Sequence, residues 1–170
     1  LPTKLVKVAA VNDAPVIGEF DTAVTYVDFA LPLLLESQHA PIHVYSASRA
    51  AGRLTVAVSA NGQTTDRIGI KHVGSLAAQI GVSGSTVSYA GVPIGTFVGT
   101  TSLVLTLNDK ATPLAVQALL RSITFSSLSE NPSVLDRTIK VTLTDGDGGT
   151  SNLPTKLVKV AAVNDAPVIG

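Results

Sequence analysis

The sequence predicts an all-β protein, folded as a β-sandwich that carries one short helix. Aromatic residues make up 4% of the chain and charged residues 14%, while Val, Thr, Ala, Ser, Gly and Leu dominate. This composition favours strands and turns over helices linked by ion pairs. Apolar and polar residues alternate with a period of two in separate segments, and turn-forming residues stand between them. Short strands at regular spacing, with turns between them, indicate a sandwich.

Three segments carry the clearest strand pattern. They are residues 53–59, 103–107 and 138–144, in each of which every second residue is Leu, Val or Ile. That period places one face of each strand in the core. The turns expected between strands are Asn61-Gly62, Ser83-Gly84, Asn108-Asp109, Asn131-Pro132 and the run Asp145 to Gly149.

The segment TPLAVQALLR, residues 112–121, departs from the strand pattern. Thr112 can cap a helix, Pro113 suits the first helical position, and the apolar residues recur at a spacing of four. A short helix inserted between two strands is therefore predicted, and its expected role is to cover an open end of the core.

Both ends of the chain carry the same eighteen residues, LPTKLVKVAAVNDAPVIG, at positions 1–18 and 153–170. Leu153 repeats Leu1, so the period, 153 minus 1, is 152 residues, which is the size of a domain rather than of a solenoid repeat. The chain is interpreted as a cut from a tandem array. Residues 1–14 are assigned to the last strand and linker of the preceding repeat, 15–165 to one module, and 166–170 to the start of the next.

The duplication has a structural consequence. Residues 3–11 and 155–163 are identical strand formers, but one module has a single place for its last strand. The first copy is therefore expected to be orphaned in this chain. It is predicted either to stay disordered or to pair at a sheet edge of another molecule, which would give a strand-exchanged dimer through residues 1–11.

Composition and charge exclude several function classes. Twelve acidic and twelve basic residues balance, and the basic residues are scattered with few aromatic residues between them, which argues against nucleic acid. Cysteine is absent, so a disulfide framework and a thiolate metal site are excluded. The sequence contains no run of about 18 apolar residues, so no membrane span is predicted.

Enzyme motifs also fail, and the chain is predicted not to be an enzyme. The segment Gly81 to Ser85 misses the GxSxG pattern because its fifth residue is serine. His39 and His43 have the spacing of a helical metal pair, but Pro41 stands between them and His72 is the one further histidine. No glycine-rich phosphate loop is present.

A family resemblance rests on three stretches. These are VNDAPVI in both end copies, the run from Thr112 to Asn152 that ends in DGDGGTSN, and the segment Thr65 to Ile68. They resemble the cadherin-like tandem repeats of very large bacterial surface and secreted proteins, many of them adhesins. The resemblance implies an immunoglobulin-like Greek-key sandwich, an extracellular or cell-surface location, and calcium at the joints between modules. Glu36 to His39 replace an expected Asp-rich turn, and extra strands or loops are expected between Gly62 and Gly99.

Calcium binds six to eight oxygen ligands, and the acidic runs of the sequence can be judged by that rule. Strand direction should bring the 145–149 turn near the start of the module, because in a sandwich with an odd number of strands the loop before the last strand lies beside the start of the first. The expected ligands are Asn12, Asp13, Asp145 and Asp147, with Asn164 and Asp165 at the next joint and Asp66, Asp109 and Glu36 as further candidates. Turn formation alone is the alternative explanation of these residue types. The spacing does not fit an EF-hand.

Two functions follow from these features. The first is a calcium-binding, rigid extender or adhesive module that contacts neighbouring identical repeats and mediates cell adhesion or aggregation. The alternative is a carbohydrate-binding sandwich, which is expected to expose Tyr26, Tyr45 and Tyr89 together on one face.

Overall fold

A computed structural model describes residues 1–9, 13–18, 20, 23–36, 44–45 and 52–163. Within these residues the chain forms thirteen strands and one helix, so the predicted all-β sandwich with one short helix is confirmed. In chain order the elements are β1 (Val16–Ile17), β2 (Val24–Val27), β3 (Leu33–Leu34), β4 (Val44–Tyr45), β5 (Arg53–Ala60), β6 (Asp66–Ile70), β7 (Ile80–Ser83), β8 (Thr86–Tyr89), β9 (Val92–Val98), β10 (Ser102–Leu107), α1 (Pro113–Leu120), β11 (Ile123–Ser127), β12 (Arg137–Thr144) and β13 (Thr155–Ala161).

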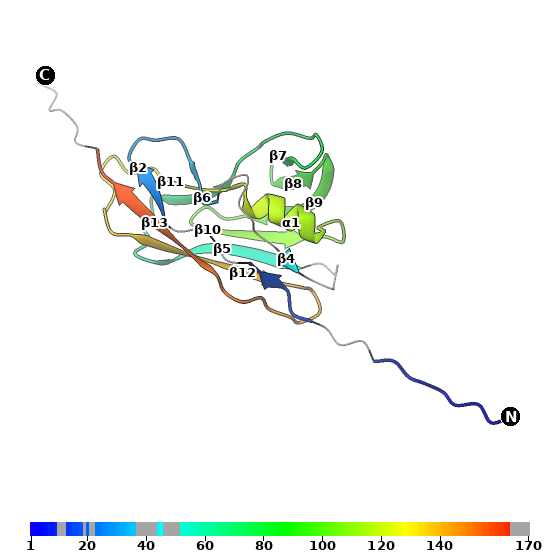
Figure 1. Cartoon of the computed structure of the whole chain (residues 1–170). Coiled ribbons are helices and arrows are strands. Elements are labelled where there is room, and N and C mark those ends of the chain that lie inside the picture. The colour runs from blue at the N-terminus through cyan, green and yellow to red at the C-terminus, as the bar shows by residue number, and fades with distance from the viewer. Residues whose placement is uncertain (10–12, 19, 21–22, 37–43, 46–51, 164–170) are drawn as a thin grey trace, which may run out of the picture.

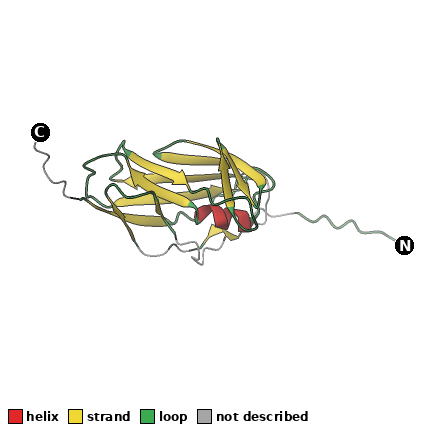
Figure 2. Ribbon diagram, turned by 90° about the horizontal axis from the view of Figure 1, so that it is seen from above, coloured by secondary structure: helices red, strands yellow, loops and turns green. Residues whose placement is uncertain are grey.

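The strands form one large sheet and two small ones. The large sheet has the order β2-β13-β12-β5-β10-β9-β8-β7, and the small sheets are β3-β11-β6 and β1-β4. Neighbouring strands of the described residues run antiparallel, except β13 and β2, which run parallel. Figure 1 and Figure 2 show the strands along the length of the molecule, and in Figure 1 residues 1–9 and the end of β13 lie at opposite ends.

The strands predicted from period two lie at the centre of the large sheet. β5 pairs with β10 on one side and with β12 on the other. Leu54, Val56, Val141 and Leu143 point to the same face and are at most 4% exposed. Opposite this face, Phe125 of β11 is fully buried. Alternating residues from both layers thus build the core, as the pattern predicted.

The region from Gly62 to Gly99 forms four strands. They are β6, which joins the small sheet, and β7, β8 and β9, which extend the large sheet. The turn between β7 and β8 uses Gly84 at φ 57°, a left-handed conformation that glycine adopts without steric cost. The predicted Ser83-Gly84 turn is therefore confirmed.

The helix is also confirmed. Oγ1 of Thr112 accepts a hydrogen bond from the amide of Ala115 at 3.2 Å, and Pro113 occupies the first helical position. This pairing satisfies one of the amides that a helix start leaves without an intrahelical partner. The helix buries Ala115, Val116, Leu119 and Leu120 against the core, as a cover for one side of the sandwich should.

The two identical end copies have different structures. Residues 155–161 form β13, inserted between β12 and β2. Residues 3–9 form no strand, are exposed throughout, and lead away from the body of the molecule in Figure 1. Val158 is fully buried, whereas its counterpart Val6 is 74% exposed. The C-terminal copy therefore fills the place for the last strand, and the N-terminal copy is left outside.

Candidate functional site

The turn between β12 and β13 is closed by the side chain of Asp145. Its Oδ1 accepts hydrogen bonds from the amides of Asp147 at 3.0 Å and Gly149 at 2.7 Å. The amide of Asp145 in turn donates to the carbonyl of Gly149 at 3.1 Å. Gly148 adopts φ 99°, which other residues rarely reach. The sequence DGDGG thus folds into a tight turn around one carboxylate, which is 4% exposed.

The N-terminal linker packs on this turn. A Cβ added to Gly149 would collide with Oδ2 of Asp145 and lie 2.9 Å from Cα of Ala14. Asn152 fastens the same segment, because its Oδ1 accepts from the amide of Ile17 and its Nδ2 donates to the carbonyl of Ile17, both at 2.8 Å. The turn therefore lies against the residues that follow Asp13, at the end of the molecule where the module begins.

Three predicted ligands lie outside the described residues: Asn12, Asn164 and Asp165. Asp13 and Asp147 are exposed, whereas Asp145 is buried. Within the part of the chain that the structure describes, no group of three or more His, Cys, Asp or Glu side chains is arranged to hold a metal ion. Asp145 is thus the described carboxylate that is both buried and beside the linker.

Glu36 and Asp66, two of the further ligand candidates, are buried and are not the solvated turn residues that the alternative explanation predicts. Nζ of Lys156 donates to Oε1 of Glu36 at 2.8 Å, with both side chains at most 2% exposed. Asp66 receives Nε of Arg137 on Oδ2 at 3.0 Å and Nη2 on Oδ1 at 3.3 Å, and both side chains are again buried. Each carboxylate already has a cation from its own chain, which burial requires of a charge.

Asp109 differs from these two. It is exposed and lies 3.4 Å from Nζ of Lys110, with 73% of its side chain open to solvent. Such a surface pair contributes little to stability. Asp109 therefore serves as a solvated turn residue in the described structure.

Asp28 is a candidate that the sequence did not indicate. It follows β2 at the other end of the molecule and is 4% exposed. Its Oδ1 accepts from the amide of Phe29 at 2.9 Å, while Oδ2 is buried with no hydrogen-bond partner among the described residues. Its amide donates to the carbonyl of Ala161, the last residue of β13. A buried carboxylate oxygen without a partner fits a cation or a water molecule, because leaving it unsatisfied is costly.

The residue pattern around Asp28 gives no sign of its burial. It stands after the strand VTYV, where a solvated turn residue is the ordinary expectation. Its burial follows from the parallel pairing of β2 with β13, a contact between segments more than 130 positions apart. The position of Asp28, buried beside the end of β13, is therefore visible only in the folded structure and not in the sequence.

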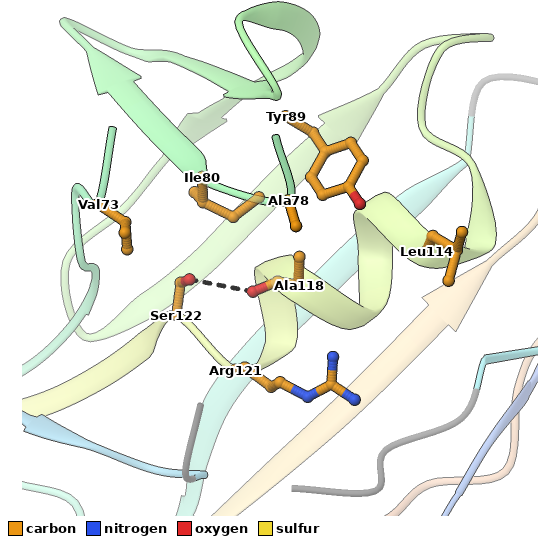
Figure 3. A pocket seen from close by; sticks show the side chains of 8 residues that line it. All are labelled: Val73, Ala78, Ile80, Tyr89, Leu114, Ala118, Arg121 and Ser122. Carbon is orange, nitrogen blue, oxygen red and sulfur yellow. Dashed lines mark hydrogen bonds between the residues drawn. The ribbon is translucent and has the colours of Figure 1, made fainter. Parts of the chain in front are cut away.

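A pocket of about 260 Å³ lies between α1 and the strands β7 and β8. Figure 3 shows the ring of Tyr89 above the helix, Ile80 and Ala78 on the far wall, and Ser122 donating a hydrogen bond to the carbonyl of Ala118. The lining residues are Val73, Ala78, Ile80, Tyr89, Leu114, Ala118, Arg121 and Ser122. An aromatic ring beside apolar and polar groups is the kind of surface that small ligands use.

The three-tyrosine face expected of a carbohydrate module is not formed. Tyr26 is 1% exposed and stacks edge-on against Phe125, with ring centroids 5.5 Å apart. Tyr89 is half-buried, and the side chain of Tyr45 lies outside the described part of the structure. Tyr26 is therefore a core residue.

The histidines considered as zinc ligands fall in two places. His39 and His43 lie outside the described residues. His72 is exposed, and its Nδ1 accepts from the amide of Val82 at 2.9 Å, which gives the ring a structural partner.

Comparison with known proteins adds no family. The chain matches no protein-family model, and no curated protein matches it. No helix in the described residues is long and apolar enough to cross a membrane.

Proposed function

We propose that the chain is a calcium-binding extender module of an extracellular tandem-repeat protein, in which each joint between repeats is stiffened by an ion. One observation carries the proposal. A buried aspartate stands at each end of the module, Asp145 beside the entering linker and Asp28 beside the exit from β13. The linker sequence VNDAPVIG occurs at both ends of the module. In an array, each joint would therefore lie between Asp28 of one module and Asp145 of the next.

The donor set suits calcium better than softer metals. Carboxylate, amide and carbonyl oxygens are the ligands that calcium takes, in a flexible geometry that admits water. At a joint, Asp28 would come from the preceding module, Asn164 and Asp165 from the linker, and the 145–149 turn from the following module. Bound calcium would supply the charge that holds these oxygens together. Asn152 already ties the linker to this end of the module through its two hydrogen bonds to Ile17.

The role supported best is that of a spacer in a long cell-surface or secreted protein of the adhesin type. Many modules in series would project a terminal binding domain from the cell, and weak contacts between identical repeats would be multiplied by repetition. The described residues contain no metal-binding side-chain cluster complete in itself.

A melting experiment tests the calcium site. A two-repeat chain, in which residues 19–170 follow a second time so that one joint is complete, is heated in excess EDTA and in 10 mM calcium, as the wild type, as Asp145→Asn in the second repeat, and as Asp165→Ala in the linker between the repeats. Extracellular modules bind calcium with dissociation constants of about 0.1 to 1 mM, so the ion should add about 1.4 to 2.7 kcal/mol to the free energy of unfolding. The control is Asp136→Asn in the second repeat, an exposed carboxylate just before β12, whereas the 145–149 turn follows β12. Equal calcium responses in all four proteins would refute the proposal.

The orphaned end copy supports a second part of the proposal. In an array, residues 1–11 would complete the preceding module in the way that residues 155–161 complete this one. In the isolated chain they would pair with a second copy, giving a strand-exchanged dimer. The molecular mass in solution tests this: a dimer that becomes a monomer on deletion of residues 1–11 supports strand exchange, and an unchanged mass refutes it.

Carbohydrate binding is the alternative function, and the pocket in Figure 3 is the observation that favours it. A sugar ring would stack on Tyr89, since aromatic faces are common in such sites. Isothermal titration with a panel of mono- and oligosaccharides, repeated with Tyr89→Ala, tests this. Heat of binding that disappears in the variant would favour the alternative.

A further inference from the structure

Exposed apolar side chains gather at the end of the molecule where β13 leaves the sandwich. Their exposure is large, between 45% for Val163 and 87% for Leu31. Monomeric proteins rarely leave such side chains together on one surface unless that surface binds something. We call this set the apolar collar; its members are Phe29, Leu31, Leu128, Val134, Leu135 and Val163.

Hydrogen bonds bring the three parts of the collar to the same end. The hydroxyl of Tyr26 lies 3.4 Å from both the carbonyl of Ala30 and that of Ser127, so the residues next to them, Leu31 and Leu128, belong to adjoining loops. Nη1 of Arg137 donates to the carbonyls of Ser133 and Leu135 at 2.6 Å and thereby ties the third loop down.

Two further contacts close the collar around the exit of β13. Arg137 is opposite Val158 of β13 in the sheet register. The amide of Asp28 donates to the carbonyl of Ala161, which places the Phe29 loop beside the end of the same strand. Figure 1 shows β2 and β13 ending together at the C-terminal end of the molecule. The loops of the collar are thus held by polar contacts, and the apolar side chains of the collar are exposed.

The sequence identifies what would cover this surface. Residues 164–170 repeat residues 12–18, and residues 16 and 17 form β1 of this module. Val168, the copy of Val16, is seven positions after Ala161, and seven extended residues span at most about 25 Å. A following repeat must therefore begin close to the collar. The N-terminal end of that repeat would present the counterparts of Val16 and Leu153, whose side chains are 48% and 50% exposed in this module.

We infer that the apolar collar packs against the N-terminal end of the next copy of the module, as a direct apolar contact between consecutive repeats. The inference rests on the proposed tandem function, but it requires no ion. It adds to the joint a patch that excludes water around the proposed calcium ligands, where electrostatic interactions become stronger.

The absence of tryptophan from the sequence allows a clean test. Leu31→Trp is made in the 170-residue chain and in the first repeat of a two-repeat chain, in which residues 19–170 follow a second time. Acrylamide quenching of the fluorescence is measured in EDTA and in calcium. The quenching constant is expected to fall about threefold in the two-repeat chain, because packed interfaces exclude solvent. Phe29→Trp provides a second reporter in case the first variant fails to fold.

Leu76→Trp is the matched control. Leu76 is 71% exposed in the loop before β7, which Figure 1 shows toward the N-terminal end, and in the first repeat that end has no neighbour. Its quenching should be the same in both chains. Protection of the Leu31→Trp reporter in the two-repeat chain, with or without calcium, supports the inference even if calcium raises no melting temperature.

Two results would overturn the inference. One is equal quenching of the Leu31→Trp reporter in the two chains under both conditions, whatever the calcium melts show. The other is protection that is already present in the single chain and grows with protein concentration, because the collar would then bind another molecule rather than the next repeat.

Discussion

Nζ of Lys156 donates a hydrogen bond to Oε1 of Glu36 at 2.8 Å, across 120 positions of sequence and inside the sandwich. The same lysine in the N-terminal copy, Lys4, is exposed to solvent. One sequence thus appears in a buried and in an exposed setting within a single chain. This gives stability experiments an internal control.

Lys156→Met is expected to destabilise the module by about 3 to 5 kcal/mol, because it leaves the carboxylate of Glu36 buried without its cation. Lys4→Met makes the same change in the same local sequence and should alter the free energy of unfolding by less than about 0.5 kcal/mol. Urea denaturation measures both. Similar losses of stability in the two variants would mean that the ion pair of Lys156 with Glu36 does not stabilise the module as predicted.

Arg137→Lys should destabilise the module by about 2 kcal/mol or more. Lysine keeps the charge but cannot contact Asp66 through two nitrogens and also donate to the carbonyls of Ser133 and Leu135. Arg53→Lys, at an exposed position of β5, is the control and should be nearly neutral. Equal denaturation midpoints for the two variants would contradict the assigned role of Arg137.

Thr112→Ala is expected to cost about 1 kcal/mol, because it removes the oxygen that accepts from the amide of Ala115. Thr112→Ser retains that oxygen and should recover most of the stability. Differential scanning calorimetry compares the three proteins. A serine variant as unstable as the alanine variant would show that the hydroxyl is not the cause.

Removal of residues 1–9 should leave the free energy of unfolding of the monomer unchanged within about 0.5 kcal/mol, since these residues are exposed and form no strand. Removal of residues 155–161 should abolish cooperative unfolding of the monomer, because it takes Val158 and Val160 out of the core and separates β12 from β2. Circular dichroism during urea titration distinguishes the two. A large loss from the first deletion would show that the N-terminal copy contributes to the fold.

The elements that depend on local patterns could be predicted from the sequence. The strand at 53–60 follows from alternating Leu54, Val56 and Val58, and the helix follows from Thr112 and Pro113 ahead of an apolar run. The contact of the 145–149 turn with the linker could also be anticipated, because it depends on strand direction rather than on side-chain detail.

The long-range polar contacts could not be predicted. In the segment TKLVKVA, the alternation could equally have placed Leu157 inside, and the burial of Lys156 is explained only by Glu36 on a distant segment. Asp66 and Arg137 are 71 positions apart and likewise meet only in the folded chain. The burial of Asp28 depends on the parallel pairing of β2 with β13, which no short-range pattern encodes.

That parallel pair has a mechanical consequence. Val24 to Val27 of β2 lie beside Val158 to Ala161 of β13 and run in the same direction. Once the contacts of Ile17 with Asn152 have broken, a pull on the two ends of the chain reaches β2 from its first residue and β13 from its last. The two strands would then slide past each other, and the hydrogen bonds between them would be loaded together rather than opened one at a time. Resistance to tension would therefore come from β2 and β13, which in the unloaded molecule form only one edge of the large sheet.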